Sequence, residues 1–193
     1  MISKLLSIPG LFELQQRLCN NYGNVKVEFS GYLDERQLRV LDVGCSTGAC
    51  GQAIYDIAAI DYTGIDITNR YIEYAKRNHS SGKYLVMDGR DLSFENATFD
   101  VVSFVGVLHH MDDDTAGRSL SEAKRVLKNT GVLIVAEPVF TPGSLVSNIF
   151  LSIDRGKFIR ESGQYEKLLD KFRIERIRYF RFSLHRFISF VAR

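Results

Sequence analysis

The sequence predicts an α/β protein built on a doubly wound, mostly parallel sheet. Short β-type runs alternate with helical patterns along most of the chain, as they do where crossover helices join parallel strands. The last two β-type runs are separated by only three residues, and so short a connection requires an antiparallel hairpin. A chain of 193 residues can bury one good core but is short for two. We therefore expect one domain with five parallel strands followed by a hairpin.

The first half of the chain predicts three strands and two helices. The apolar run Leu38–Val43 is the first expected strand, and Ala49–Ala59 is the helix that follows it. The second strand and helix, and the third strand, are expected at Tyr62–Ile67, Asn69–Asn78 and Lys83–Met87.

The middle of the chain predicts the centre of the sheet. Phe99–Leu108 is strongly apolar and β-branched, which is typical of a buried central strand. Asp112–Lys128 predicts a helix, because its apolar residues fall on one face, aspartates stand at its start and Gly131 lies just past its end. Val132–Glu137 is the expected fifth strand.

The C-terminal part predicts a different pattern. Thr141–Gly143 is a breaker, after which Leu145–Ile153 indicates a short amphipathic helix. The remaining expected elements are a helix at Ser162–Lys171, strands at Phe172–Phe180 and Leu184–Ala192, and the connection Arg181–Ser183.

We expect four parts within the single domain. Residues 1–35 form an N-terminal helical lid segment, in which Leu11, Leu14 and Leu18 mark a helix expected to pack over the carboxyl edge of the sheet. Residues 36–139 form a core, 140–160 a lid insertion, and 161–193 the last helix and the hairpin.

The composition is that of an ordinary globular protein, and we expect neither a membrane span nor a signal peptide. Three cysteines, Cys19, Cys45 and Cys50, are an odd number without metal-ligand spacing, so we expect reduced thiols, no metal and a cytoplasmic location.

The charge is unevenly distributed. From Leu151 to Arg193 the chain carries 11 Lys and Arg against 5 Asp and Glu, although the whole chain is only +2. Two interpretations stand: the last strands and helix have basic solvent faces, or this end lies near an anionic substrate or partner.

The strongest local signal is the turn Val40–Gly48, Val-Leu-Asp-Val-Gly-Cys-Ser-Thr-Gly, which follows one predicted strand and opens a helix. Gly44 permits a sharp turn and close approach of a ligand, because no Cβ stands in the way. Gly48 begins a helix whose N–H groups favour a carboxylate or phosphate. The spacing is Gly-x-x-x-Gly, with Ser46 between, and it differs from the Gly-x-Gly-x-x-Gly of pyrophosphate-binding turns.

This turn resembles the first motif of class I S-adenosylmethionine-dependent methyltransferases, commonly Asp-x-Gly-Cys-Gly-Thr-Gly, with Ser46 at the middle glycine. Gly64–Ile67 resembles the second motif, and Asp66 supplies a carboxylate that can accept both hydrogen bonds of a ribose diol. Met87–Gly89 resembles the third motif, whose Asp88-type side chain accepts from the adenine amino group.

Two further segments extend the resemblance over roughly Leu38–Ala192. Phe99–His110 resembles the fourth motif, and Val126–Leu133 resembles the family's Leu-Lys-Pro-Gly-Gly turn into the fifth strand. Taken singly, each motif also fits an ordinary strand-end turn; five in order favour the family. The resemblance implies a Rossmann-like sheet of order 3-2-1-4-5-7-6, S-adenosylmethionine as cofactor, and these cofactor-binding residues: Asp42, Gly44, Cys45, Ser46, Gly48, Asp66, Ile67, Asp88, Gly89 and Val105.

The fourth motif disfavours methylation of DNA bases. Phe104–Val107 lacks the Asn/Asp-Pro-Pro-Tyr segment of amino-methylating enzymes, and no cysteine follows Cys50 to serve as the nucleophile of cytosine-C5 enzymes. We expect a small-molecule acceptor, and RNA methylation at a different kind of site stays an alternative.

Methyl transfer from a sulfonium is an in-line displacement, so the enzyme mainly positions the reactants and excludes water. A hydroxyl acceptor also needs a general base. His109 and His110 follow the fourth strand, and either is a candidate catalytic residue; the other interpretation is that they only shape the pocket.

Arg155, Lys157 and Arg160 stand beside aromatic residues in the predicted insertion. The N-terminal helix and this insertion resemble those of small methyltransferases found with sugar and cell-envelope biosynthesis. The resemblance implies that these cations hold a phosphate or carboxylate of a saccharide-type or envelope-precursor acceptor; the other interpretation is that they are surface charges of a lid. The rival classes are a non-catalytic S-adenosylmethionine-binding module, which nothing in the motifs requires, and an NAD-dependent oxidoreductase, which the glycine spacing and the hairpin oppose.

Overall fold

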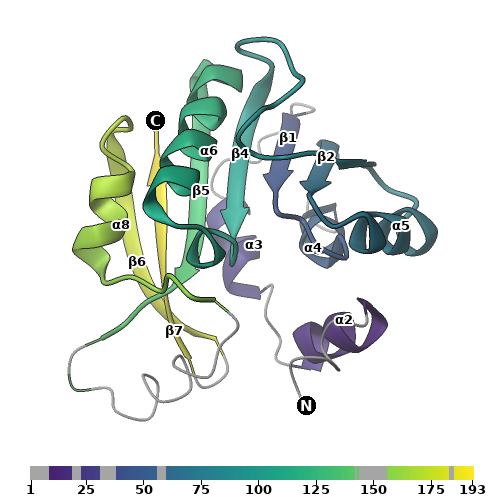
Figure 1. Cartoon of the computed structure of the whole chain (residues 1–193), viewed down its shortest axis with the longest axis horizontal. Helices are drawn as coiled ribbons and strands as arrows, with labels where there is room; N and C mark the ends of the chain where they lie inside the picture. Colours follow the sequence, from purple (N-terminus) through teal and green to yellow (C-terminus); the bar gives the residue numbers. More distant parts are fainter. Residues whose placement is uncertain are drawn as a thin grey trace.

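The computed structural model describes residues 9–18, 23–30, 38–55, 60–141, 143, 156–182 and 185–193 (Figure 1). Its seven strands form one sheet in the order β3-β2-β1-β4-β5-β7-β6, which confirms the expected topology. The strands are β1 Leu38–Val43, β2 Ile60–Asp66, β3 Lys83–Val86, β4 Phe99–Val105, β5 Leu127–Pro138, β6 Ile174–Phe182 and β7 His185–Ala192.

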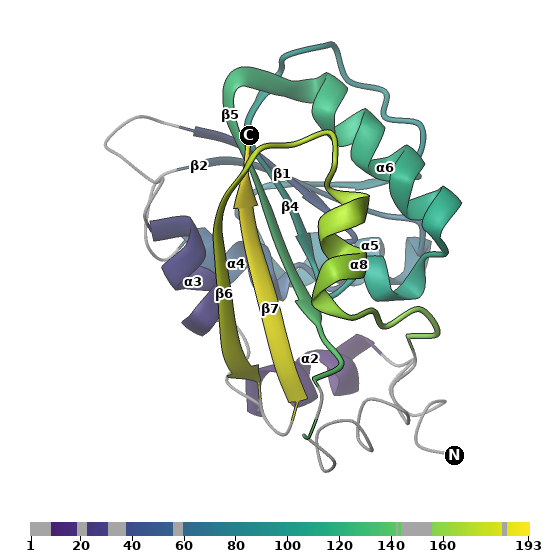
Figure 2. The same cartoon turned by 90° about the vertical axis from the view of Figure 1, so that its left-hand side faces the viewer.

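Helices cover both faces of this sheet, as Figure 2 shows. One apolar cluster lies between the sheet and α6 and α8, and a second lies between the sheet and α3, α4 and α5. The helices are α2 Pro9–Leu18, α3 Gly23–Ser30, α4 Ala49–Tyr55, α5 Asn69–Asn78, the 3₁₀ turn η1 Leu108–His110, α6 Asp113–Val126 and α8 Ser162–Leu168.

The first five strands along the chain pair in parallel, and β7 pairs antiparallel with both β5 and β6. The carboxyl ends of the parallel strands therefore meet at one edge of the sheet, the lower edge in Figure 1. Helix α2 lies on the same side in both views, and its Gly10 approaches Tyr74 of α5. This is the placement expected for the N-terminal helix.

Two predicted boundaries are wrong for a physical reason. Gly131 does not end α6, because β5 begins directly at Leu127 and Gly131 lies inside that strand. The last helical carbonyls need no glycine cap: Arg125 and Val126 accept from the backbone N–H groups of the loop that precedes β4. Likewise β4 ends at Val105, and the expected last residues of that strand turn into η1.

The hairpin also differs from its predicted form. Arg181 and Phe182 pair with Arg186 and His185, so the strands continue through most of the expected connection. Several predicted features lie outside the described residues: the breaker residue Pro142, the helix Leu145–Ile153, Arg155, Cys19 and residues 56–59.

A buried carboxylate fastens α3 to the hairpin. Glu28 is fully buried and accepts hydrogen bonds from Arg176, Arg178 and Ser189. Arg173 and Arg193 in turn pair with Glu175. These four arginines have structural partners, so part of the basic C-terminal charge serves the fold.

Candidate active site

The turn between β1 and α4 takes a backbone path that favours residues without a Cβ. Gly44, Ser46 and Gly48 all have positive φ angles, of 77°, 50° and 82°. A Cβ on Gly44 would stand 2.3 Å from Cγ2 of Val107, so this position also requires glycine for space. The backbone N–H groups of Gly44 and Cys45 both donate to the carbonyl of Ile65, at 2.8 and 2.9 Å, which ties the turn to β2.

Asp66 stands at the end of β2 and joins two turns. Its Oδ2 accepts from the N–H of Ser46 at 3.1 Å, and its Oδ1 accepts from the N–H of Thr68 at 2.8 Å. A carboxylate has about four acceptor positions, so roughly two remain for a ligand. The next residue, Ile67, is 71% exposed, which presents a large apolar side chain beside this carboxylate.

Ser46 carries a further sign of a ligand site. Its Oγ is buried, and within the described part of the chain it has no hydrogen-bond partner. Buried hydroxyls are normally paired, so an unpaired one in a glycine-rich turn fits a polar ligand that lies against the turn. The carboxylate, the exposed isoleucine and this hydroxyl together suit the ribose, adenine and amino-acid parts of S-adenosylmethionine.

Asp88 and Gly89 follow β3 at the same edge. The carboxylate of Asp88 is bound by the guanidinium of Arg90, which lowers the pKa of Asp88. Gly89 lies close to the end of β1, where a Cβ would be 2.9 Å from Cγ1 of Val43. The backbone after Asp88 therefore runs directly beside the first strand.

Two of the expected cofactor residues, Asp42 and Cys45, are buried, and a third, Val105, is half-buried. Asp42 is buried, and its carboxylate accepts from the hydroxyls of Tyr62 and Ser103, both at 2.8 Å. Burial raises the pKa of Asp42 to about 6. The side chain of Cys45 is also buried, with its thiol pKa raised by burial, and Val105 packs against the second apolar cluster. The side chains of Asp42 and Cys45 are thus buried beneath the turn, whereas Val105 is half-buried.

The segment Val107–Met111, which we call the histidine turn, follows β4 and carries both candidate histidines. Glu137 at the end of β5 is fully buried beneath it. Its Oε1 accepts from the N–H groups of Val107 and Leu108, at 2.9 and 2.8 Å. Its Oε2 accepts from the N–H of His109 at 3.3 Å and lies 2.7 Å from Nδ1 of the same residue.

Glu137 belongs to none of the motifs that predicted the site. A charged residue inside the apolar run Val132–Val139 was the available signal, because a carboxylate is rarely buried without partners. His109 is buried, whereas His110 is exposed, and the centroids of their rings are 4.1 Å apart.

Arg160 corrects one expectation. Its guanidinium is buried and makes five hydrogen bonds, which use all five N–H donors. The acceptors are Asp113 and the carbonyl oxygens of Leu108, Met111 and Phe158. Arg160 therefore has no donor left for an acceptor's phosphate, and its role is in the fold of the histidine turn. Lys157 is exposed.

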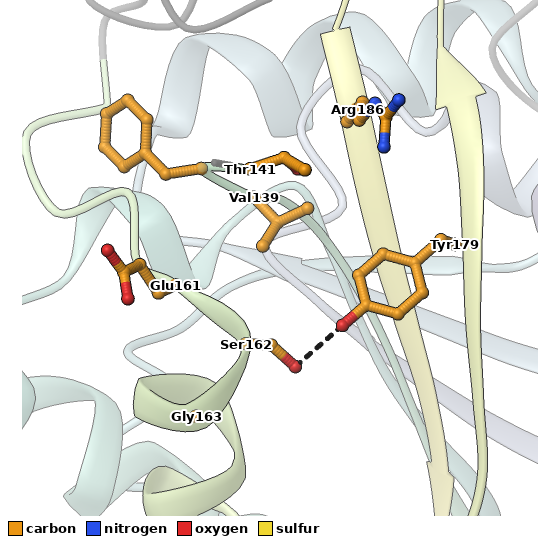
Figure 3. Close-up of a pocket in the computed structure, with 8 residues that line it drawn as sticks. Val139, Thr141, Glu161, Ser162, Gly163, Tyr179 and Arg186 are labelled. Carbon is orange, nitrogen blue, oxygen red and sulfur yellow. Dashed lines mark hydrogen bonds between the residues drawn. The ribbon is translucent and has the colours of Figure 1, made fainter. Parts of the chain in front are cut away.

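A pocket of about 350 Å³ opens beyond the end of β5 (Figure 3). Val139 and Phe140 line it from the segment that follows β5, Ser162 lines it from α8, and Tyr179 and Arg186 line it from the hairpin. The hydroxyl of Tyr179 lies 3.0 Å from that of Ser162, which joins β6 to α8 across the pocket.

Among the described residues, no group of three or more His, Cys, Asp or Glu side chains could hold a metal ion. Nor does any described helix have the length and apolar character needed to span a membrane.

Comparison with known proteins places this geometry in a family. Residues 40–131 match the family model described as a methyltransferase domain. An O-methyltransferase of Aspergillus nomiae is 33% identical over 108 residues, which cover 53% of this chain and 47% of that protein. A demethylmenaquinone methyltransferase of Thermotoga maritima is 29% identical over 100 residues, 51% of this chain and 43% of that protein. The chain thus aligns with about half the length of these curated relatives.

Solved structures share the fold. Magnesium protoporphyrin IX methyltransferase of Synechocystis, solved with SAH bound, superposes with a TM-score of 0.71 at 18% identity, over 92% of this chain and 82% of that one. The sheet order, the motifs at the strand ends and the matched family model agree. Residues 40–131 therefore match a methyltransferase domain, and the sheet order and strand-end motifs are those of the class I S-adenosylmethionine-dependent methyltransferases, whose cofactor is S-adenosylmethionine.

Proposed function

We propose that this protein transfers a methyl group from S-adenosylmethionine to a small-molecule acceptor. One observation carries the proposal: the turn at Gly44–Gly48 is bonded to Asp66 and places the buried, unpaired hydroxyl of Ser46 and the exposed Ile67 at one edge of the sheet. These groups match the polar and apolar parts of one cofactor.

The proposed contacts follow from the donors and acceptors present. Asp66 accepts the ribose hydroxyls through its remaining lone pairs, and Ile67 packs against the adenine ring. The Asp88–Gly89 backbone meets the edge of that ring, with Asp88 already paired to Arg90. The N–H groups and the hydroxyl of the glycine turn bind the amino-acid part.

The bound cofactor supplies a sulfonium methyl group, and the chain's own residues position the acceptor and exclude water. We propose that a histidine of the histidine turn removes the proton when the acceptor is a hydroxyl. His109 is buried against Glu137, whereas His110 is exposed. Single substitutions of each therefore test separate roles.

The acceptor class is proposed from the relatives and from the pocket beyond β5. The two relatives named above include an O-methyltransferase and a quinone methyltransferase, which favours a hydroxyl-bearing small molecule. Arg186 lines the pocket, and Arg181 lies directly opposite it across the hairpin, so both side chains stand on one face. The guanidinium of Arg186, beside the apolar side chains of Val139 and Phe140, supports an acceptor with an anionic group.

We further propose a role for each of the four expected parts of the domain. Residues 1–35 and 140–160 cover the acceptor, residues 36–139 bind the cofactor, and 161–193 complete the sheet. The position of α2 on the carboxyl-edge side supports the first assignment. The cytoplasmic location stays a prediction.

The test begins with calorimetric titration of the purified chain with S-adenosylmethionine, S-adenosylhomocysteine and NAD. We expect saturable binding of the first two and none of NAD. Transfer of a labelled methyl group is then measured on a panel of phenols, quinols, carboxylated sugars and envelope precursors, with a structured RNA included. Binding without transfer to any member would favour the non-catalytic module, and transfer to the RNA alone would replace the acceptor class.

A further inference from the structure

We infer that Glu137 and Arg160 are positioning residues for methyl transfer, because they hold the histidine turn from its two sides. The inference rests on the proposed function and adds to it a pair of residues that do not themselves touch the reactants. Glu137 binds N–H groups of the turn, and Arg160 binds its carbonyl oxygens.

Glu137 does more than satisfy a turn. Three successive backbone N–H groups would be met equally well by water or by carbonyl oxygens, without burying a charge. A fully buried carboxylate is costly unless several hydrogen bonds compensate it, and here a fourth partner is the imidazole of His109, 2.7 Å away. The carboxylate therefore fixes the backbone and one ring in a single arrangement.

This contact selects one tautomer of His109. Since the carboxylate is an acceptor, Nδ1 carries the hydrogen, and in the neutral ring Nε2 then carries the lone pair. The ring of His110 lies against this ring, so its position also depends on the held turn. Arg160 and, from α6, Asp113 are charged groups at the turn that pair with each other, and Asp112 and Lys157 lie close by in the chain segments that flank and cross it.

Arg160 holds the opposite side and couples a second segment to it. Residues Gly156–Arg160, which we call the strap, lie across the turn. The N–H of Phe158 donates to the carbonyl of His109 at 2.9 Å, and a Cβ on Gly156 would stand only 2.0 Å from Cδ2 of that ring. The five donors of Arg160 thus lock the strap onto the turn.

The physical consequence is preorganisation. Misplacing a reacting group by about 1 Å can cost about 100-fold in rate, even when the cause is remote from the chemistry. Neither Glu137 nor Arg160 makes a hydrogen bond to the turn Gly44–Gly48 among the described contacts, so we expect the cofactor to bind normally when either residue is replaced.

The first test is Glu137→Gln, which keeps the shape but directs amide hydrogens at two donors of His109. On the substrate found in the panel, we expect kcat to fall about 100-fold with the affinity for S-adenosylhomocysteine unchanged. Glu95→Gln, an exposed glutamate far along the chain, is the matched control and should leave kcat unchanged. Equal turnover in Glu137→Gln and wild type would overturn the inference.

A spectroscopic reading separates positioning from simple loss of fold, and needs no acceptor. In ¹⁵N NMR of histidine-labelled protein, wild type should show His109 protonated at Nδ1 near neutral pH, assigned by loss of the signal in His109→Gln. In Glu137→Gln, with a cooperative melt and bound S-adenosylhomocysteine, this signature should disappear. If the signal persists in Glu137→Gln, Glu137 does not position His109, and this conclusion holds whether or not an acceptor for methyl transfer is found.

Arg160 is tested by chemical rescue. Asp113, its carboxylate partner, is 84% exposed on its side chain, so the space left by Arg160→Ala opens toward solvent. We expect Arg160→Ala and Arg160→Lys to lose kcat, because an ammonium cannot replace a planar fork. Added guanidinium should restore part of the rate to Arg160→Ala, and methylammonium should not. Equal recovery with both cations, or none with either in a folded variant, would exclude the positioning role; Lys167→Ala on α8 is the exposed control.

Discussion

Ser46 and Asp66, which come from the first two strand–turn units, are joined by a hydrogen bond of 3.1 Å from the backbone N–H of Ser46 to the carboxylate of Asp66. This bond sets the spacing between the turn expected to hold the amino-acid part of the cofactor and the carboxylate expected to hold its ribose. The two motifs are thus joined by the protein's own backbone, without a ligand.

Asp66→Asn should weaken the binding of S-adenosylmethionine by about 10- to 100-fold, which corresponds to the loss of one to two charge-assisted hydrogen bonds. An amide offers one acceptor oxygen where the carboxylate offers two, and its NH₂ meets the N–H of Ser46 or Thr68. Calorimetric titration measures the effect. Asp61→Asn at the other end of β2 is the control, since Asp61 pairs only with surface cations among the recorded contacts.

Ser46→Gly should stabilise the fold by about 0.5–1 kcal/mol. A left-handed φ costs an L-residue about 1–2 kcal/mol, and the extra chain entropy of glycine cancels only part of that gain. Ala97→Gly is the matched variant, since Ala97 also has a positive φ, of 52°. Urea unfolding should show both gains, and only Ser46→Gly should weaken the cofactor, through loss of the Oγ. Equal cofactor affinity in the two variants would show that the hydroxyl of Ser46 does not bind the cofactor.

Asp42→Asn should change the pH dependence of stability. Burial raises the pKa of Asp42 from 3.8 to about 6 in the folded state, so the folded protein binds the proton more tightly than the unfolded chain. The wild type therefore loses stability from this group as the pH rises from about 4 to about 6, by up to about 3 kcal/mol. The asparagine does not titrate, so the variant should gain on the wild type across this window in urea melts. A constant difference would contradict the buried, protonatable carboxyl.

Glu28→Gln should lower the free energy of unfolding by about 1–3 kcal/mol, because it removes the charge that pairs two hairpin arginines with α3. Arg176 and Arg178 are partly exposed and can be hydrated again, which keeps the loss toward the lower end. Cofactor affinity should not change. Glu175→Gln, whose partners are on the surface, should cost much less in the same chemical denaturation experiment.

Local patterns in the sequence determined the order of the strands and helices, the antiparallel hairpin and the position of the cofactor turn. These follow from contacts between near neighbours: an apolar run forms a strand, and the glycine spacing at Gly44 and Gly48 forms the turn whose positive φ angles the structure contains. Asp66 could be found in the same way, because parallel strands end at one edge.

The tertiary structure alone decided which side chains face the site. Asp42 belongs to the first motif, yet its carboxylate points inward to Tyr62 and Ser103. Arg160 donates hydrogen bonds to the histidine turn, which is about 50 residues away in the chain. Glu137, at the end of β5, accepts from three successive backbone N–H groups of the turn that follows β4. Such partners are chosen by packing between distant segments, where a buried charge must find every hydrogen bond it needs, and no spacing along the chain encodes that choice.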